Sequence, residues 1–202
     1  MLLSAEHLSI NFGSRQLLDD VNFYLNEGDK VGVIGINGTG KSTFLKVLSG
    51  VTEPDGGTIS RNPNVQVSLL PQNPVMEESA TVLEQVFLHF PAEFRELNEY
   101  EAKAMLNRLG ITDFAQKVGT LSGGQRKRVA LAAALIHPAD VLILDEPTNH
   151  LDSEMVAWLE DWLRRFKGGL VMVTHDRYFL ERVVNHITEL SRGKLYHYEA
   201  NY

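Results

Sequence analysis

Residues 35–42 read Gly-Ile-Asn-Gly-Thr-Gly-Lys-Ser and match the pattern G-x-x-x-x-G-K-[ST] of a phosphate-binding loop. The apolar run at residues 31–34 before them reads as a buried strand, and residues 43–48 after them read as a helix. Glycines let backbone N–H groups turn inward around phosphate oxygens, and a helix N-terminus adds the positive end of its dipole. A glycine-rich turn without a ligand is the alternative interpretation. The flanking strand and helix favour a site for a nucleoside triphosphate.

Two side chains of this loop carry the chemistry that a triphosphate needs. Lys41 can reach the β- and γ-phosphates, and the Ser42 hydroxyl can ligate Mg²⁺. The sequence therefore predicts ATP and Mg²⁺ as ligands. The loop positions expected to contact the nucleotide are Gly35, Asn37, Gly38, Thr39, Gly40, Lys41, Ser42 and Thr43.

Composition indicates a cytoplasmic globular protein. The chain has 202 residues, 44% of them hydrophobic, which is enough to bury a full core as one domain or as one domain with a subdomain. It has no cysteine, which excludes disulfides and thiolate metal sites and suits a reducing compartment. No apolar run approaches the roughly 18 residues of a membrane span, and the N-terminus lacks the charged region of a signal peptide. We expect no membrane partner.

The formal charge of −7 argues against a broadly basic surface for nucleic acids. The densest basic cluster is Arg126-Lys127-Arg128. A solvated helix face is the favoured interpretation of this cluster over a local nucleic-acid patch.

The order of predicted elements is that of an α/β fold. Residues 2–10 and 17–25 read as antiparallel strands, whereas the apolar runs at 141–144 and 170–173 are typical of central parallel strands. Residues 81–109 turn helical, beginning with a capping box between Thr81 and Glu84. After Pro91 the apolar positions Leu97, Tyr100, Ala104 and Leu109 are predicted to continue one helical face. A long helix follows Leu121, and Asp152 caps another.

Two carboxylates, Asp145 and Glu146, stand where the apolar strand at 141–144 ends. Acidic side chains beside an apolar core are costly unless a cation or a catalytic role compensates. In a phosphate-loop fold Asp145 can help to hold Mg²⁺, and Glu146 can polarise a water for attack on the γ-phosphate. The alternative is that these carboxylates only cap a helix or turn at the strand end. The phosphate loop about a hundred residues earlier favours the catalytic interpretation over this alternative.

Residues 121–125, Leu-Ser-Gly-Gly-Gln, match the signature sequence of ATP-binding-cassette proteins, and the whole chain resembles that superfamily. A Ser followed by two glycines at a helix start offers N–H groups and a hydroxyl to an anion, although a plain helix N-cap has the same form. The resemblance implies that Ser122, Gly123, Gly124 and Gln125 contact the ATP of a second, facing cassette. It also implies a phosphate-loop domain over residues 1–202 with a mainly parallel core sheet, an antiparallel β subdomain and a helical subdomain at roughly 74–137.

Three further positions take their roles from the resemblance. Gln72 matches the glutamine that senses Mg²⁺ and the attacking water, and His175 matches the histidine that contacts the γ-phosphate. Phe12 occupies the place of the aromatic that stacks on adenine, where a core aromatic is the alternative. The expected catalytic residues are Lys41, Gln72, Glu146 and His175, and the expected metal ligands are Ser42, Gln72 and Asp145.

Residues 145–152, Asp-Glu-Pro-Thr-Asn-His-Leu-Asp, and residues 174–180 are similar to the ABC-F branch, soluble translation factors with two cassettes in one chain. Residues 198–202 resemble the end of a first cassette, before its linker. The implied partners are a second cassette and, for a full-length protein, the ribosome. Residues 73–120 leave little room for the arm that touches the ribosome in that branch, so ribosome binding by this chain alone is in doubt. The ATPase subunit of a transporter is the alternative function.

Overall fold

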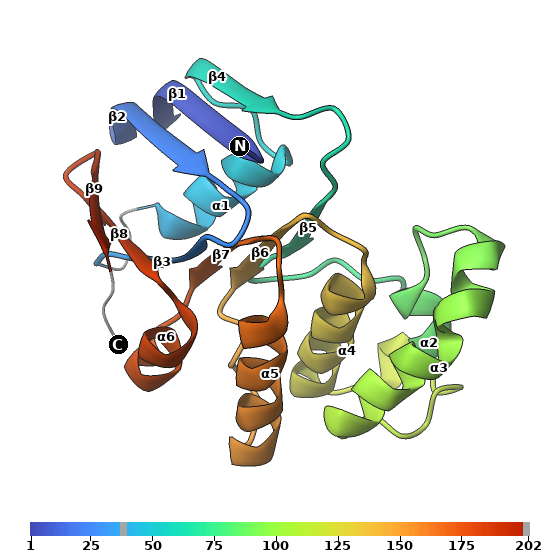
Figure 1. Ribbon diagram of the computed structural model, residues 1–202. Coiled ribbons are helices and arrows are strands. Elements are labelled where there is room, and N and C mark those ends of the chain that lie inside the picture. The colour runs from blue at the N-terminus through green and yellow to red at the C-terminus, as the bar shows by residue number, and fades with distance from the viewer. Residues whose placement is uncertain (37–39, 200–202) are drawn as a thin grey trace. The chain divides into compact units, whose positions relative to one another are not determined.

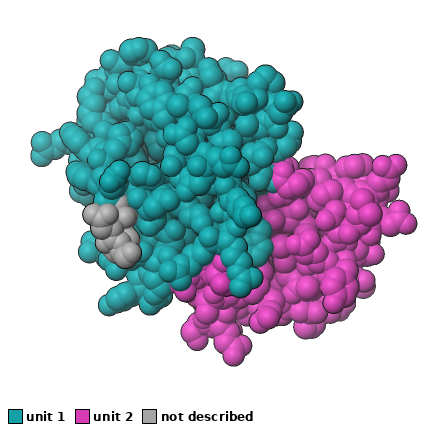
Figure 2. Space-filling model, in the orientation of Figure 1, with its two compact units in different colours: residues 1–72, 139–147, 162–202 teal, residues 73–138, 148–161 magenta. Residues whose placement is uncertain are grey.

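The computed structural model describes residues 1–36 and 40–199, and the chain divides into two compact units. Unit 1 comprises residues 1–72, 139–147 and 162–202, and unit 2 comprises residues 73–138 and 148–161 (Figure 2). Unit 1 carries both β-sheets, and unit 2 is built from helices and loops.

The first sheet of unit 1 is antiparallel and has the strand order β2-β1-β4 (Figure 1). Its strands are β1 (Leu3–Phe12), β2 (Arg15–Leu25) and β4 (Gly56–Arg61). The pairing of β1 with β2 shifts register after Ala5, so the buried positions change from Leu3 and Ala5 to Leu8 and Ile10. The antiparallel strands expected from the sequence are confirmed.

The second sheet has the order β5-β6-β7-β3-β8-β9 and is parallel except for its last pair. It comprises β3 (Lys30–Ile34), β5 (Val67–Leu70), β6 (Val141–Asp145), β7 (Gly169–Val173), β8 (His186–Ser191) and β9 (Lys194–Glu199). Every residue of β6 and β7 is buried, as central parallel strands require. The predicted α/β fold with a mainly parallel core sheet is confirmed.

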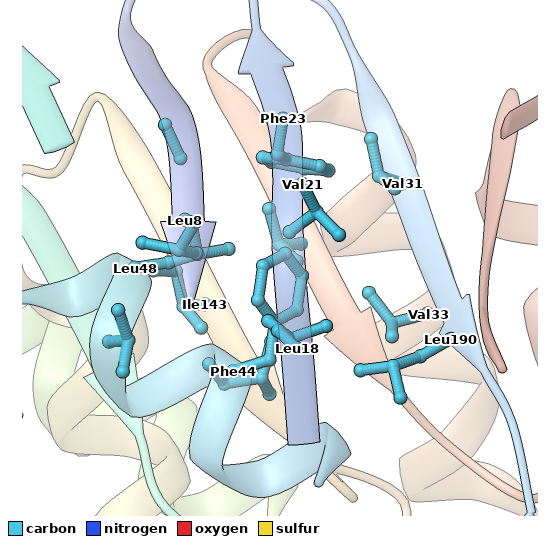
Figure 3. Packing of buried hydrophobic residues seen from close by; sticks show 14 of the residues in the cluster. Leu8, Leu18, Val21, Phe23, Val31, Val33, Phe44, Leu48, Ile143 and Leu190 are labelled. Carbon is cyan, nitrogen blue, oxygen red and sulfur yellow. The ribbon is translucent and has the colours of Figure 1, made fainter. Parts of the chain in front are cut away.

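Helix α1 (Lys41–Ser49) lies between the two sheets of unit 1, and α6 (Arg177–Val183) follows β7 (Figure 1). Phe44 of α1 meets Phe23 of β2 edge to face, with ring centroids 5.4 Å apart. Leu8, Val33 and Ile143 bring β1, β3 and β6 into the same cluster of buried side chains (Figure 3). Because this core lies against α1, it fixes the start of the helix that follows the phosphate-binding loop.

Unit 2 contains α2 (Val82–Val86), α3 (Ala92–Arg108), the short 3₁₀ helix η1 (Val118–Thr120) and α4 (Gly123–Ile136). It also holds the first residues of α5 (Ser153–Arg165), where Asp152 accepts a hydrogen bond from the Met155 N–H at 2.9 Å. The capping box predicted between Thr81 and Glu84 is confirmed at the start of α2, and so is the Asp152 cap. Across residues 1–36 and 40–199, no helix combines the length and the apolar character needed to cross a bilayer.

Two sequence expectations within unit 2 are wrong. Leu97 and Tyr100 of α3 are 84% and 88% exposed, because the buried face of this helix uses Ala102, Met105 and Leu106 instead. Apolar residues occur on both sides of α3, so periodicity alone selected the wrong face.

The basic cluster in α4 is not a solvated helix face either, since its residues are half-buried. Arg126 donates to the carbonyl of Gly119 at 3.2 Å, and Arg128 donates to the carbonyl of Leu109 at 2.9 Å. Both guanidinium groups thus satisfy backbone carbonyls of neighbouring loops, and Arg126 also lies 3.6 Å from the Glu78 carboxylate.

Candidate functional site

The carboxyl ends of β3, β6 and β7 lie at one edge of the parallel sheet, where α/β folds generally bind ligands. A cavity of about 340 Å³ opens there, lined wholly by residues of unit 1. Its lining residues are Gly40, Lys41, Ser42, Thr43, Gln72, Asp145, Glu146, Val173 and His175. The fold therefore brings residues that are spread from Gly40 to His175 in the sequence together in a single cavity.

The cavity wall formed by the phosphate-binding loop begins at Gly40, the N-cap of α1, whose φ of 94° is in the left-handed region that favours glycine. The ammonium group of Lys41 donates to the carbonyl of Gly35 at 2.5 Å, so this side chain lies along the loop. Ser42 Oγ lies 3.4 Å from Gln72 Oε1, which brings two of the three expected metal ligands into contact. The expected nucleotide contacts Asn37, Gly38 and Thr39 lie outside the described residues.

Glu146 is a buried polar residue of the cavity, with 7% of its surface exposed. Its backbone has a φ of 53°, an uncommon conformation for a residue with a side chain, and its N–H donates to the carbonyl of Val173 at 2.7 Å. The His175 N–H donates to Glu146 Oε2 at 3.3 Å. His175 Nε2 also lies 3.1 Å from Glu146 Oε1, a contact without the alignment of a hydrogen bond. The end of β7 thus holds the carboxylate in place.

Burial raises the pKa of the Glu146 carboxyl above its ordinary value, and the nearby negative charge of Asp145 acts in the same direction. Electrostatic interactions with His175 and Lys41 oppose this rise in the pKa of Glu146, and the hydrogen bond from the His175 backbone N–H opposes it too. A carboxylate with a raised pKa accepts a proton more readily than an ordinary one. Glu146 consequently has the environment of a general base.

Oxygen atoms suited to Mg²⁺ converge on the same cavity. Ser42 contributes a hydroxyl, Gln72 an amide oxygen and Asp145 a carboxylate that is 3% exposed. Among the described residues no group of three or more His, Cys, Asp or Glu side chains is arranged to hold a metal ion. This fits Mg²⁺, which usually takes only one or two carboxylates and completes its shell with water and phosphate oxygens.

Phe12 lies at the end of β1 and is 75% exposed, so it is not a core residue. It does not line the cavity of about 340 Å³. Its exposed ring remains available for stacking, the role that the resemblance assigns to it.

The signature residues form the first turn of α4 in unit 2. Ser122 is the N-cap: its hydroxyl accepts a hydrogen bond from the Gln125 N–H at 3.2 Å, and Gln125 Oε1 accepts one from the Ser122 N–H at 2.9 Å. The same residues can therefore cap the helix and bind an anion. The capping box uses only the N–H groups of Ser122 and Gln125, so the other N–H groups of the turn are not used by it. The pattern S-x-x-Q could have identified this use of the Gln125 side chain.

The two signature glycines have different surroundings. A Cβ atom on Gly123 would meet no other atom within 4 Å, whereas one on Gly124 would lie 3.4 Å from the Cβ of His150. His150 itself has a φ of 66°. Gly123 therefore offers an open backbone surface, and His150 covers Gly124. The sequence analysis gave no site role to His150, which lies in the segment 145–152, or to Val173, which ends the apolar run at 170–173.

Comparison with known proteins agrees with this geometry. The ABC transporter family profile matches residues 18–149. The Bacillus subtilis ABC transporter ATP-binding protein YfmR is 42% identical over 238 residues, covering 100% of this chain and 38% of YfmR. The energy-dependent translational throttle protein EttA of Escherichia coli (strain K12) is 36% identical over 226 residues, covering 93% of this chain and 41% of EttA. The chain thus spans less than half the length of these relatives.

Solved structures with the same fold include an ATP-binding subunit of an ABC transporter. It is 25% identical with a TM-score of 0.87 and covers 98% of this chain and 90% of its own. A dimeric post-hydrolysis state of the cassette MJ0796 with ADP and Pi has a TM-score of 0.85 at 24% identity, with full coverage of both chains. The matched profile, the identities and the assembled cavity lead to one conclusion: the chain belongs to the ATP-binding-cassette family of P-loop ATPases.

Proposed function

We propose that the chain is the ATP-binding and ATP-hydrolysing cassette of an ABC-F protein that acts on the ribosome in translation. In this proposal residues 1–202 form one cassette with a helical subdomain at roughly 74–137, and the cassette works as half of a two-cassette ATP sandwich in the cytoplasm. The observation that carries the ATPase part is the single cavity shared by Lys41, Ser42, Gln72, Asp145, Glu146 and His175.

In the bound state, the Lys41 ammonium leaves the Gly35 carbonyl for the β- and γ-phosphate oxygens, and the exposed Phe12 ring stacks on adenine. Ser42, Gln72 and Asp145 hold Mg²⁺, which supplies positive charge to the phosphates when bound. The N–H groups and hydroxyl of Ser122, Gly123, Gly124 and Gln125 face the γ-phosphate held by a second cassette.

Hydrolysis is the attack of water on the γ-phosphorus. Glu146 takes the proton of the attacking water, the new bond joins the water oxygen to phosphorus, and the bond to the β-phosphate oxygen breaks to leave ADP. The buried position of Glu146 raises its pKa and makes it a better base. His175 orients this carboxylate through its backbone N–H, and its imidazole, which lies beside Glu146, would contact the γ-phosphate when ATP is bound.

The ribosomal part of the proposal is supported by the relative EttA, whose name describes a translational throttle, at 36% identity over 93% of this chain. The segment at residues 145–152, with its Asn-His-Leu-Asp run, supports the ABC-F branch as well. The aligned stretch of YfmR is 238 residues against the 202 of this chain, so that relative has additional residues within the cassette. The difference in length agrees with a ribosome-contacting arm that is present in YfmR and absent from this chain.

Sedimentation of three proteins with and without Mg·ATP tests the two-cassette mechanism. The wild-type chain is expected to be mainly monomeric, with ATPase activity that rises faster than linearly with its concentration. Glu146→Gln should accumulate as a dimer in Mg·ATP, because this variant cannot hydrolyse the ATP that holds the two cassettes together. Ser122→Arg should abolish that dimer while leaving the ATP affinity of the monomer nearly unchanged, since the signature faces the partner's nucleotide.

Fast hydrolysis with a constant specific rate down to nanomolar protein would overturn the facing-cassette mechanism. The translational role is tested separately, by co-sedimentation of the full-length Glu146→Gln protein with purified ribosomes in Mg·ATP. Absence of ribosome binding, together with co-purification of the protein with an integral membrane protein, would favour a transporter subunit instead.

A further inference from the structure

A separate cavity of about 260 Å³ lies in unit 1 at the amino-terminal ends of β3 and β8. It shares no lining residue with the nucleotide cavity, which is at the carboxyl ends of the parallel strands. Sites for drug-sized ligands usually measure roughly 300–1,000 Å³. This cavity therefore suits a single group of the size of a side chain.

Strand register shows which side chains face this cavity. Across the sheet Val31 lies beside His186, Thr188 beside His197, and His186 beside Glu199. Paired residues on neighbouring strands point to the same face. Val31 and Thr188 are 4% and 2% exposed and line the inner part of the cavity, whereas His197 and Glu199 on the same face are exposed and line its rim.

Asp29 adds a second carboxylate in a fixed position. Its Oδ2 accepts the N–H of Asn26 at 2.8 Å, and its Oδ1 lies 3.4 Å from His186 Nε2. The turn that carries it is tied to Asn185, which donates to the Gly28 carbonyl at 3.0 Å. Asp29 is consequently held at the cavity by backbone contacts that do not depend on a ligand.

The cavity carries two carboxylates, and the one basic side chain placed beside either of them among the described residues is His186 at Asp29. No Lys or Arg lines it, and Glu199 has no partner among the described residues. The nearest cation in sequence, Lys30, donates its ammonium to the carbonyl of Arg164 at 2.6 Å and does not line the cavity. Two carboxylates that share a small cavity favour a cationic ligand.

The His197 ring adds a flat surface to this pair of carboxylates. It is held by Thr188, whose hydroxyl lies 3.0 Å from Nδ1, and it lies 6.3 Å from the Phe23 ring. A guanidinium is planar, stacks on such rings and presents several N–H donors to carboxylates, whereas an ammonium is a compact point charge. We propose that this cavity binds a guanidinium group, either of an arginine side chain or of a free guanidinium compound.

Backbone amide NMR tests the site with N-acetylargininamide as the probe and N-acetylcitrullinamide as its uncharged isostere. Saturable shifts are expected at Val31, Thr188 and His197 with the arginine probe and at least tenfold weaker binding with citrulline. Asp29→Asn and Glu199→Gln should each weaken binding of the arginine probe at least tenfold. The matched control is Glu53→Gln, which removes the same charge from an exposed position of unit 1 outside the cavity and should change nothing.

The absence of localised shifts, equal binding of the two probes, or full binding by both carboxylate variants would overturn the proposal. Spermidine binding at least as tightly as the arginine probe would overturn the preference for guanidinium. Agmatine and a capped Gly-Arg-Gly peptide distinguish the two sources: tighter binding of the peptide assigns the site to a protein segment, and tighter binding of agmatine assigns it to a free compound. Saturating Mg·ATP should leave the affinity unchanged, because the two cavities share no residue.

Discussion

The nucleotide cavity of unit 1 and the signature turn of unit 2 are both anion sites of the proposed ATPase, yet they are built in opposite ways. The cavity buries its key carboxylate, with Glu146 7% exposed and tied to β7. In the signature turn Ser122 and Gly123 are exposed, and the hydrogen bonds of the capping box are made within the turn itself. A buried site owes its chemistry to shifted pKa values and fixed distances, whereas an exposed turn has only its N–H groups to present. Chemistry should therefore depend on unit 1, and unit 2 should contribute only when another cassette faces it.

The largest expected effect separates chemistry from binding within the cavity. Glu146→Gln keeps the size of the side chain and removes the base, so ATP hydrolysis should fall by roughly 10²-fold or more while ATP still binds. Single-turnover hydrolysis and calorimetry measure the two quantities. A variant that hydrolyses ATP at the wild-type rate, in preparations free of contaminating ATPase, would show that Glu146 is not the base.

The next effect concerns binding. Lys41→Ala removes a charge-assisted contact to phosphate that is worth roughly 1.5–3 kcal/mol, so the Kd for ATP should rise at least about tenfold. Calorimetric titration of the lone chain measures it. Unchanged affinity would contradict the assignment of the loop that ends at Ser42.

A smaller effect is expected at the signature turn. Ser122→Ala removes the hydroxyl that accepts the Gln125 N–H, which should lower the free energy of unfolding by about 1 kcal/mol. The ATP affinity of the lone chain should not change. Gly123→Ala is the matched control for the cap, since a Cβ there meets nothing within 4 Å. Weaker ATP binding by the monomeric Ser122→Ala chain would break the contrast between the two units.

The last prediction uses pH. Because burial raises the pKa of Glu146, the folded chain keeps that proton to a higher pH than the unfolded chain does. Wild-type stability should then fall relative to Glu146→Gln as pH rises from about 4, and the difference should become constant once Glu146 is ionised in both states. Denaturant titrations of both proteins across this range measure the difference. A difference that does not vary with pH would contradict the raised pKa.

The central parallel strands could be predicted from sequence because they are short apolar runs between helices, as at residues 141–144. The Thr81 and Asp152 caps could be predicted because their chemistry is local. The face of α3 could not, since Leu97 and Met105 are equally apolar and only the packing of unit 2 decides between them. Burial of this kind is a tertiary property that no single helix period encodes.

The candidate site divides along the same line. Lys41 could be predicted from the phosphate-loop motif, and Glu146 from its place at the end of an apolar strand in a chain with that loop. The contact between His150 and Gly124 and the left-handed backbone of Glu146 left no sequence signal. Both features arise from the fold around the end of β6. The positive φ of Glu146 is imposed by the surrounding structure, since glutamate has no intrinsic preference for it.

The sheet order has a consequence for the timing of synthesis. β3, which leads into the phosphate-binding loop, is bonded on its two sides to β7 and β8, and the Lys30 N–H bonds to Asn185, 155 residues later. At roughly 5–20 residues per second, translation leaves β3 without its neighbours for about 10 to 30 s. During that interval both edges of an apolar strand can pair with other chains. The loop that is expected to bind ATP is synthesised early, but the strands that flank β3 are synthesised late. Nascent chains should therefore be most prone to aggregate before β7 and β8 are synthesised.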